Sequence, residues 1–180
     1  NARRAQLCTG EVKPNQAHIA LAEFEKRFSG AFTLITQNVD NLHQSAGSTN
    51  IFAMHGELVK ARCLDCNAVM DCLQNIDENS VCASCNSFGS LRPHIVWFGE
   101  IPLFMEEIES AIAKSDLFVS IGTSGVVYPA AGFQQLAGHV GAKTVELNLE
   151  PGNIASQFDE SVYGRATEIV PRFLQSLLPG

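Results

Sequence analysis

The sequence predicts an α/β protein in which a mainly parallel sheet carries helices on both faces and a small metal-held insert interrupts it. Two observations lead to this fold class. Short apolar runs typical of buried strands alternate with segments whose apolar residues recur at helical spacing, and this alternation implies right-handed crossovers between parallel strands. Over residues 57–92 the pattern gives way to a polar stretch that contains two Cys-x-x-Cys pairs.

Composition narrows the class of protein. Of the 180 residues 46% are hydrophobic and 17% are charged, which indicates a folded domain with a substantial core. The net charge of -7 argues against a nucleic-acid binder, which would normally be basic, but permits a basic partner such as a lysine-bearing protein tail. No apolar run approaches the ~20 residues of a membrane span. The paired cysteines favour metal over disulfides, and with it a cytoplasmic protein.

Before the insert, the pattern predicts helices and short strands in alternation. After Pro14-Asn15, which offers an N-cap, apolar residues at helical spacing predict a helix that Gly30 ends. The apolar run Phe32–Thr36 predicts a strand. The other expected elements are a helix within residues 1–13, a short helix over 40–46, and extended segments over 51–54 and 58–62.

Regular patterning returns at Pro93, where an apolar run predicts a strand over 94–98 that Gly99 closes. Met105, Ile108 and Ile112 recur at helical spacing. The further expected elements are a strand over 117–121, a helix over 129–139 with a proline near its first turn, strands over 144–148 and 168–170, and a closing helix over 171–178.

The four paired cysteines predict a structural zinc site. Cys63-x-x-Cys66 and Cys82-x-x-Cys85 are separated by fifteen residues, a spacing typical of zinc ribbons. Each pair presents two thiolates on a tight turn, and the two turns can complete a tetrahedron with Zn–S bonds of about 2.3 Å. Four thiolates leave no position for water or substrate, and the insert has few apolar residues to fold around without metal. The alternative is a redox dithiol or four unrelated thiols.

Polar residues follow three of the predicted strands, where α/β proteins bind small molecules. Gln37–Asp40 follows the first strand, and Gly122–Gly125 follows a later one. The small residues of Gly122–Gly125 let backbone N–H and hydroxyl groups approach phosphate or ribose. Asn148–Glu150 offers an amide and a carboxylate to a diol, or serves as a simple loop cap. No Gly-x-Gly occurs, so the usual dinucleotide fingerprint is absent.

His55 is the best candidate for a general base. It stands beside Gly56 at the junction of sheet and insert, where a cleft between two domains would open. A single histidine is more often structural, and that interpretation stays open. Trp97-Phe98-Gly99 is either core or an edge segment that recruits a peptide by strand addition.

Taken together, these motifs resemble the sirtuins, which are NAD-dependent protein lysine deacylases. The resemblance covers essentially the whole chain and rests on six linked motifs, which are Thr36–His43, His55-Gly56, the four cysteines, Val96–Glu100, Gly122–Ser124 and Asn148–Glu150. The short insert and the stretch Leu91–Glu100 look most like the bacterial class III type, which includes desuccinylases.

The resemblance implies a Rossmann-like NAD-binding domain over 1–56 and 93–180 and a zinc-ribbon insert over 57–92. NAD would be a co-substrate and zinc structural. The acyl group would pass from the lysine of an acylated protein to ADP-ribose with release of nicotinamide, an acyltransferase and hydrolase type of reaction that covers deacetylation and desuccinylation.

The resemblance also implies residue roles. His55 would be the general base. The residues that would bind NAD are Gln37, Asn38, Val39, Asp40, Gly122, Thr123, Ser124, Asn148, Leu149, Glu150 and Ala166. The residues that would pair with the substrate backbone are Val96, Trp97, Phe98, Gly99 and Glu100. Arg3 would be the arginine of the Tyr-x-x-Arg pair that recognises acidic acyl groups in class III members.

The chain departs from the family pattern at its start. The tyrosine of that pair would fall one residue before Asn1, and the family's Gly-Ala-Gly segment, first strand and NAD-covering loop are not in the sequence. We therefore expect a sheet without a central strand, and a span that is incomplete and inactive by itself. Two other classes compete, a non-catalytic zinc-ribbon interaction module and an ordinary NAD oxidoreductase, which the lack of Gly-x-Gly disfavours.

Overall fold

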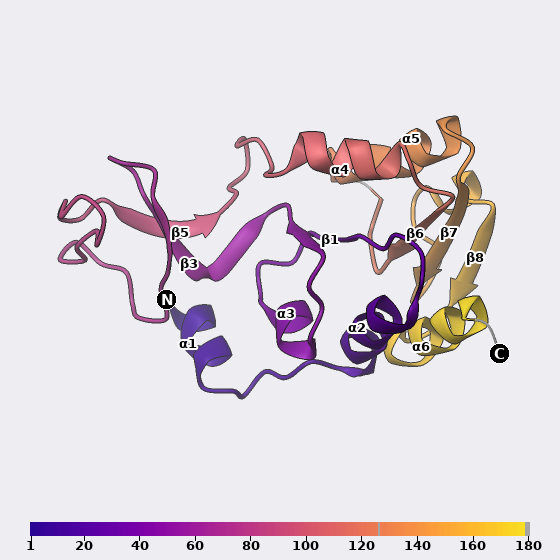
Figure 1. Cartoon of the computed structure of the whole chain (residues 1–180), viewed down its shortest axis with the longest axis horizontal. Helices are drawn as coiled ribbons and strands as arrows, with labels where there is room; N and C mark the ends of the chain where they lie inside the picture. Colours follow the sequence, from indigo (N-terminus) through magenta and orange to yellow (C-terminus); the bar gives the residue numbers. More distant parts are fainter. Residues whose placement is uncertain (126, 179–180) are drawn as a thin grey trace.

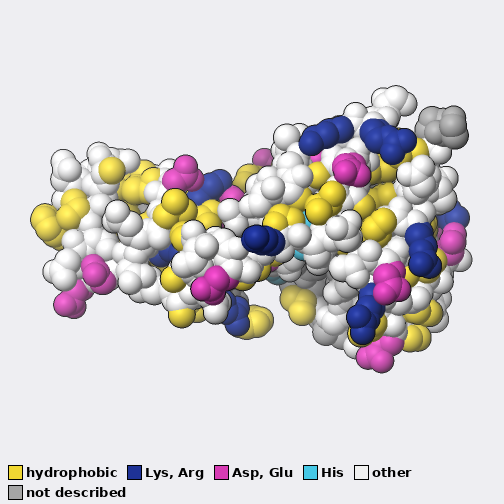
Figure 2. Space-filling view, turned by 90° about the horizontal axis from the view of Figure 1, so that it is seen from below, with side chains coloured by type: hydrophobic (Ala, Val, Ile, Leu, Met, Phe, Trp, Pro, Cys, Tyr) yellow, Lys and Arg dark blue, Asp and Glu magenta, His cyan; other side chains and the backbone are white. Residues whose placement is uncertain are grey.

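The computed structural model describes residues 1–125 and 127–178. Figure 1 shows an elongated molecule with layered helices and strands at the C-terminal end and an antiparallel sheet at the other. Seen from below in Figure 2, a narrow lobe joins a broad one. The predicted α/β class with an inserted cysteine-bearing unit is confirmed. No helix in the described part of the chain is long and apolar enough to cross a membrane.

Two parallel sheets form the layered part. One pairs β1 (Leu34–Thr36) with β2 (Ile51–Ala53), and Leu34 lies opposite Ile51. The other has the order β6-β7-β8, with bounds Leu117–Ile121, Lys143–Asn148 and Glu160–Tyr163. No ladder joins the two sheets within residues 1–125 and 127–178, so packing of side chains holds them together.

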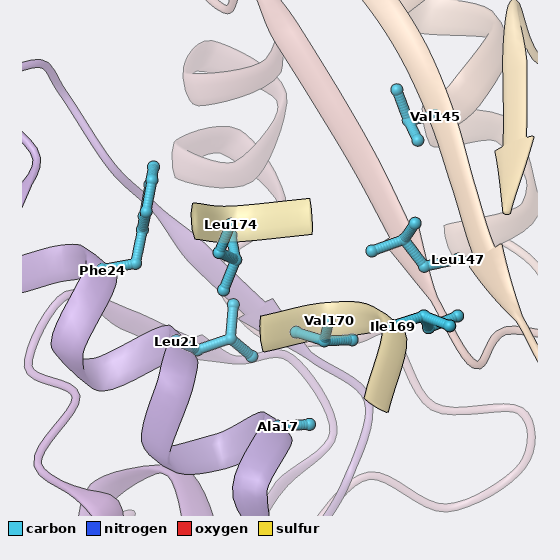
Figure 3. Close-up of a cluster of buried hydrophobic side chains, with 8 residues drawn as sticks. All are labelled: Ala17, Leu21, Phe24, Val145, Leu147, Ile169, Val170 and Leu174. Atoms are coloured by element: carbon cyan, nitrogen blue, oxygen red, sulfur yellow. The ribbon is translucent and has the colours of Figure 1, made fainter. Parts of the chain in front are cut away.

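Helices cover both faces of these sheets (Figure 1). The helices are α1 (Ala2–Cys8), α2 (Gln16–Arg27), α3 (Leu42–Ala46), α4 (Met105–Ile112), α5 (Phe133–His139) and α6 (Ala166–Leu177), with 3-10 turns at Ala130–Gly132 and Ala155–Gln157. On one face, α2 and α6 pack against β7 through the side chains drawn in Figure 3. On the other face, α4 and α5 pack around Met54.

The local signals explain the ends of several elements. The Asn15 side chain accepts hydrogen bonds from the backbone N–H groups of Ala17 and His18, which confirms it as the N-cap of α2. Helix α3 ends at Gly47, which has a φ of 102°, a conformation that glycine adopts without steric cost.

The expected strand over 168–170 is wrong, because these residues lie in α6 with Pro171 inside the helix. An interior proline costs a helix about 3 kcal/mol. Ile169, Val170 and Leu174 are buried in the core of Figure 3, and each such side chain gains about 1.5–3 kcal/mol by burial. Together they outweigh the proline. The strand that pairs with β7 is instead β8, which the sequence pattern did not indicate.

The expected strand over 94–98 is also displaced. The observed strand is β5 (Leu91–Ile95), and it pairs antiparallel with β3 (Gly56–Cys63), which also pairs with β4 (Val69–Asp71). Trp97 and Phe98 therefore lie beyond the strand and are exposed. The boundaries expected for the insert, at residues 57 and 92, fall within β3 and β5, and the division into domains stays a prediction.

Candidate active site and metal centre

The tip of β1 carries the first group of candidate residues. Thr36 is buried, and its Oγ1 accepts a hydrogen bond from the Asn38 backbone N–H at 3.1 Å. The Asp40 carboxylate accepts one from the Leu42 N–H at 3.0 Å and so begins α3. These contacts turn the chain sharply after the strand and leave the Asn38 side chain exposed at its end.

His55 lies directly opposite this turn. Its Nδ1 is 2.9 Å from the backbone oxygen of Gln37. A carbonyl oxygen only accepts, so Nδ1 must carry the hydrogen. The lone pair of the neutral ring is then on Nε2, which makes His55 a base whose tautomer and orientation the β1 tip defines.

Gly56 makes this junction possible. Its φ is +77°, and a Cβ at this position would lie 2.1 Å from the backbone oxygen of His94. The close approach lets β5 pair with the first residues of β3, where Gly56 lies opposite Ile95. The His55 backbone oxygen then accepts a hydrogen bond from the Val96 N–H at 2.9 Å, which connects the base to the expected substrate segment.

An ion pair shapes that segment. Arg92 donates from Nη1 and Nη2 to the two Glu100 oxygens at 2.6 and 3.1 Å, and the Trp97 N–H donates to Glu100 Oε2 at 3.0 Å. The hydrogen bonds from Arg92 and Trp97 lower the pKa of Glu100 to about 2. The turn from Trp97 to Glu100 is closed by these contacts, and the Phe98 side chain is left fully exposed.

Two histidines pack beside the β1 tip. The His18 and His43 rings lie 4.6 Å apart between centroids. Burial first, and then the nearby His18, lower the pKa of His43 to about 4, although Asp40 acts in the opposite direction. Burial lowers the pKa of His18 as well, so both rings are neutral at neutral pH.

The loops after β6 and β7 carry the second group of candidates. The Asn148 amide donates to the Thr123 backbone oxygen at 3.1 Å, and its Oδ1 accepts from the Leu149 N–H at 2.9 Å. Asn148 thus joins the two loops at the carboxyl edge of the sheet. Around it, Gly122, Ser124, Leu149 and Glu150 are exposed, and Ala166 begins α6 half-buried.

Sequence reasoning missed Glu146, which is buried in β7. Its carboxylate accepts hydrogen bonds from the Gly152 N–H at 3.3 Å and the Tyr163 hydroxyl at 3.1 Å. It therefore fixes the loop after β7 against β8, next to Asn148. A carboxylate inside a strand pattern is rarely buried without a partner, and this was the signal that could have found it.

The four cysteines meet as their spacing predicts. All four Sγ atoms lie within 4.8 Å of one another, and the pairs Cys63–Cys85 and Cys66–Cys82 have Sγ–Sγ distances of 3.7 Å. A tetrahedron with Zn–S bonds of about 2.3 Å has edges of about 3.8 Å. The donor set therefore fits a structural zinc ion.

The two cysteine turns also share one backbone geometry. The Asn67 N–H donates to the Cys63 oxygen at 3.0 Å and the Asn86 N–H to the Cys82 oxygen at 2.8 Å. Asn67 and Asn86 have φ values of 59° and 60°, a left-handed conformation that asparagine tolerates better than most residues. The insert thus presents its thiolates from two equivalent turns.

Arg3 is exposed on α1. The next residue, Arg4, is buried, and no pattern in the sequence distinguishes the two arginines. Arg3 therefore remains a candidate whose role depends on how α1 is held.

The comparisons with known proteins agree with this architecture. Residues 1–129 match the model of the Sir2 family. An NAD-dependent protein deacylase of Pasteurella multocida is 53% identical over 178 residues, 99% of this chain and 76% of that protein. One of Escherichia coli strain K12 is 50% identical over 180 residues, 100% of this chain and 64% of that protein.

Solved structures give the same result. A Sir2 homologue in complex with NAD superposes with a TM-score of 0.82 at 33% identity, over 91% of this chain and 64% of that chain. Sir2 bound to an acetylated peptide superposes with a TM-score of 0.79 at 30% identity, over 91% of this chain and 71% of that chain. The chain spans between 64% and 76% of the length of the two curated relatives above. By family model, identity and fold, the chain belongs to the Sir2 family.

Proposed function

We propose that the protein is an NAD-dependent protein lysine deacylase in which His55 is the general base. The observation that carries this proposal is the 2.9 Å contact between His55 Nδ1 and the Gln37 backbone oxygen. NAD is the co-substrate. Its cleavage releases nicotinamide, and its ADP-ribose part accepts the acyl group. The relatives named above support the reaction class.

His55 is prepared for proton transfer before any ligand binds. Because Nδ1 donates to Gln37, the Nε2 lone pair can take a proton from a ribose hydroxyl. The hydrogen bond also stabilises the imidazolium that forms, since the proton on Nδ1 keeps its acceptor. A half-buried ring at a strand end is reachable by substrate and held in one orientation.

We assign the NAD contacts to the carboxyl edges of the two parallel sheets, β1-β2 and β6-β7-β8. Gln37, Asn38, Val39 and Asp40 at the tip of β1 would bind the nicotinamide and its ribose, beside the base. The proposed contacts for the phosphates and the adenosine are Gly122, Thr123, Ser124, Asn148, Leu149, Glu150 and Ala166. The Asn148–Thr123 hydrogen bond supports this grouping, because it joins the two loops that one extended ligand would touch.

The acyl-lysine peptide would lie along Val96–Glu100. This segment is attached to the base through the Val96–His55 hydrogen bond, and the Arg92–Glu100 ion pair holds its shape. The exposed Trp97 and Phe98 offer an apolar surface to the methylene chain of the lysine. A peptide placed here would have its acyl group next to His55.

We assign the preference between acidic and neutral acyl groups to Arg3. A guanidinium can bind the carboxylate of a succinyl group with two parallel hydrogen bonds, which an acetyl group cannot use. We propose that the protein removes both acetyl and succinyl groups. Arg3→Met should lower kcat/KM for a succinylated peptide by about tenfold or more and that for an acetylated peptide much less. Equal losses for both peptides would reject this role.

The proposed partners are acylated lysine-containing proteins, without nucleic acid or membrane. Acidic and basic side chains are interspersed on the face shown in Figure 2, and the overall charge is -7. A four-thiolate site is suited to a reducing compartment, which supports a cytoplasmic location.

His55→Tyr tests the base assignment in the full-length protein. Loss of a general base should lower NAD-dependent acyl removal by about 10²–10⁴-fold, while zinc content and far-UV circular dichroism stay unchanged. His139→Gln is the matched control, because His139 Nδ1 makes the same kind of contact, 2.8 Å from the Gln135 backbone oxygen, at the exposed C-terminal end of α5. Retained turnover in His55→Tyr would refute the assignment.

A further inference from the structure

We propose that Arg4 and Asn1 are positioning residues that dock α1 on the metal-held insert, so that the four-cysteine site sets the placement of Arg3 and with it the preference for acidic acyl groups. The part of this inference that concerns acyl choice rests on the function proposed above. The docking itself rests on contacts in the structure alone.

Helix α1 cannot owe its order to its own sequence. It has seven residues, no side-chain hydrogen bond at its N-cap and no acidic residue in its first turn. Isolated helices of fewer than about 12 residues are marginal in water. The helix has a single buried residue, and that residue is Arg4. Its order must therefore come from what it is docked against.

Arg4 connects α1 to two segments of the insert. The residue is 1% exposed. Its Nε donates to the Leu58 oxygen in β3 at 2.6 Å, and its Nη1 donates to the Gln74 oxygen at 3.2 Å. The Leu58 N–H in turn donates to the Val39 oxygen at 2.7 Å. Arg4 therefore joins α1, the insert and the tip of β1 through one strand residue.

Asn1 makes a second, independent attachment. Its amide donates to the Ile76 oxygen at 3.1 Å and accepts from the Ile76 N–H at 3.0 Å. This pair of hydrogen bonds lies at the N-cap of the helix, and the Arg4 contacts lie about one turn later. Two attachments about a turn apart set both the position and the rotation of α1, which Figure 1 shows below β3.

The acceptors on the insert depend on the cysteine site. Gln74 and Ile76 lie between Cys66 and Cys82, in a segment that a zinc ion bound to the four cysteines would close at both ends. Strand β4 ends at Asp71, and most side chains over residues 71–80 are exposed. Few buried contacts hold this stretch, so loss of the metal should release it and the two attachments together.

Hydrogen exchange tests the docking without any catalytic readout. The probes are the amides of Ala5 and Thr9, which donate within and at the end of α1. Removal of zinc with a chelator, checked by metal analysis, should speed their exchange about tenfold or more, together with that of residues 73–80. Unchanged exchange at Ala5 and Thr9 in the zinc-free protein would overturn the coupling.

Substitutions separate the two attachments from general destabilisation. Arg4→Ala in the zinc-loaded protein should speed exchange at Ala5 and Thr9, and Asn1→Ala should do the same at an exposed position that does not threaten folding. Gln6→Ala is the control, because Gln6 is exposed on the same helix and alanine keeps helix propensity. Equal exchange rates at Ala5 and Thr9 in Asn1→Ala and Gln6→Ala would refute the positioning role of Asn1. If the amides of Ala5 and Thr9 stay protected in Arg4→Ala, the positioning role of Arg4 is refuted.

The acyl readout uses the full-length protein. A displacement of about 1 Å can cost up to a hundredfold in rate, so Asn1→Ala and Arg4→Ala should lower the ratio of desuccinylation to deacetylation, and Gln6→Ala should not. Equal loss of both activities would refute the link to acyl choice. If Arg3→Met leaves the ratio unchanged while Arg4→Ala still releases α1, the acyl role of Arg3 fails and the docking stands.

Discussion

Gly56→Ala tests the junction at which the base, the parallel layer and the insert meet. Two separate penalties apply to alanine at this position. The φ of +77° lies in the left-handed region, and the new Cβ would lie 2.1 Å from the His94 oxygen and 2.9 Å from the Ile95 Cα. Both neighbours are backbone atoms of β5, so no side chain can rotate away to make room.

The magnitude follows from these two penalties. A left-handed conformation costs alanine roughly 1–2 kcal/mol. Carbon–oxygen contacts between strands lie at about 3.3 Å or more, so β5 must move by roughly 1 Å, and overpacking of this kind typically costs about 1–3 kcal/mol. The free energy of unfolding should therefore fall by about 2–5 kcal/mol.

Gly141→Ala provides the matched control. Gly141 has a φ of +86°, and a Cβ there would meet nothing within 4 Å. It should cost only the conformational part, about 1–2 kcal/mol. Urea unfolding followed by far-UV circular dichroism, with both variants saturated with zinc, measures the difference. Equal losses for the two variants would show that the close approach of β5 to Gly56 carries no energy, and would refute the reasoning.

Two further predictions concern charged and titrating groups. His43 has a pKa of about 4 in the folded protein and an ordinary value of 6.5, so the unfolded state binds more protons between these values and stability should rise from pH 4 to 6.5. His43→Gln should flatten that slope in urea unfolding, and an unchanged slope would contradict it. The Glu100 carboxylate should titrate near pH 2 by NMR; its pairing stabilises the protein above pH 4.5 and is lost as the pH falls toward 2. Arg92→Met should return the Glu100 pKa toward its ordinary value, and an unshifted titration would reject the ion pair as its cause.

Much of the layered fold could be predicted, because its signals are local. Apolar runs located β6 and β7, and helical spacing located α2 and α4, since periodicity follows directly from which face is buried. The same logic failed at residues 168–170, where Ile169 and Val170 match a strand and a helix equally well. Only packing against α2 and β7 decides between the two. Those elements are distant in sequence, so a local pattern of residues does not include them.

The candidate site divides in the same way. His55 and the residues at the strand tips could be named from sequence because polar residues at the ends of apolar strands are local features. The Gln37 oxygen that sets the His55 tautomer could not, since backbone atoms contribute no pattern to a sequence. Glu146 and Arg4 were missed for a related reason, because their hydrogen-bond partners lie at least six positions away along the chain.

By itself, the sequence determined the protein family, the grouping of the four cysteines and the order of most elements, because motif spacing and periodicity are properties of neighbouring residues. The tertiary structure alone decided that β5 runs antiparallel to β3, that Gly56 must be glycine, and that Arg4 rather than Arg3 is buried. Each of these depends on backbone atoms from separate segments approaching within hydrogen-bond or contact distance. Such approaches are set by the packing of the whole chain, and no local pattern of residues records them.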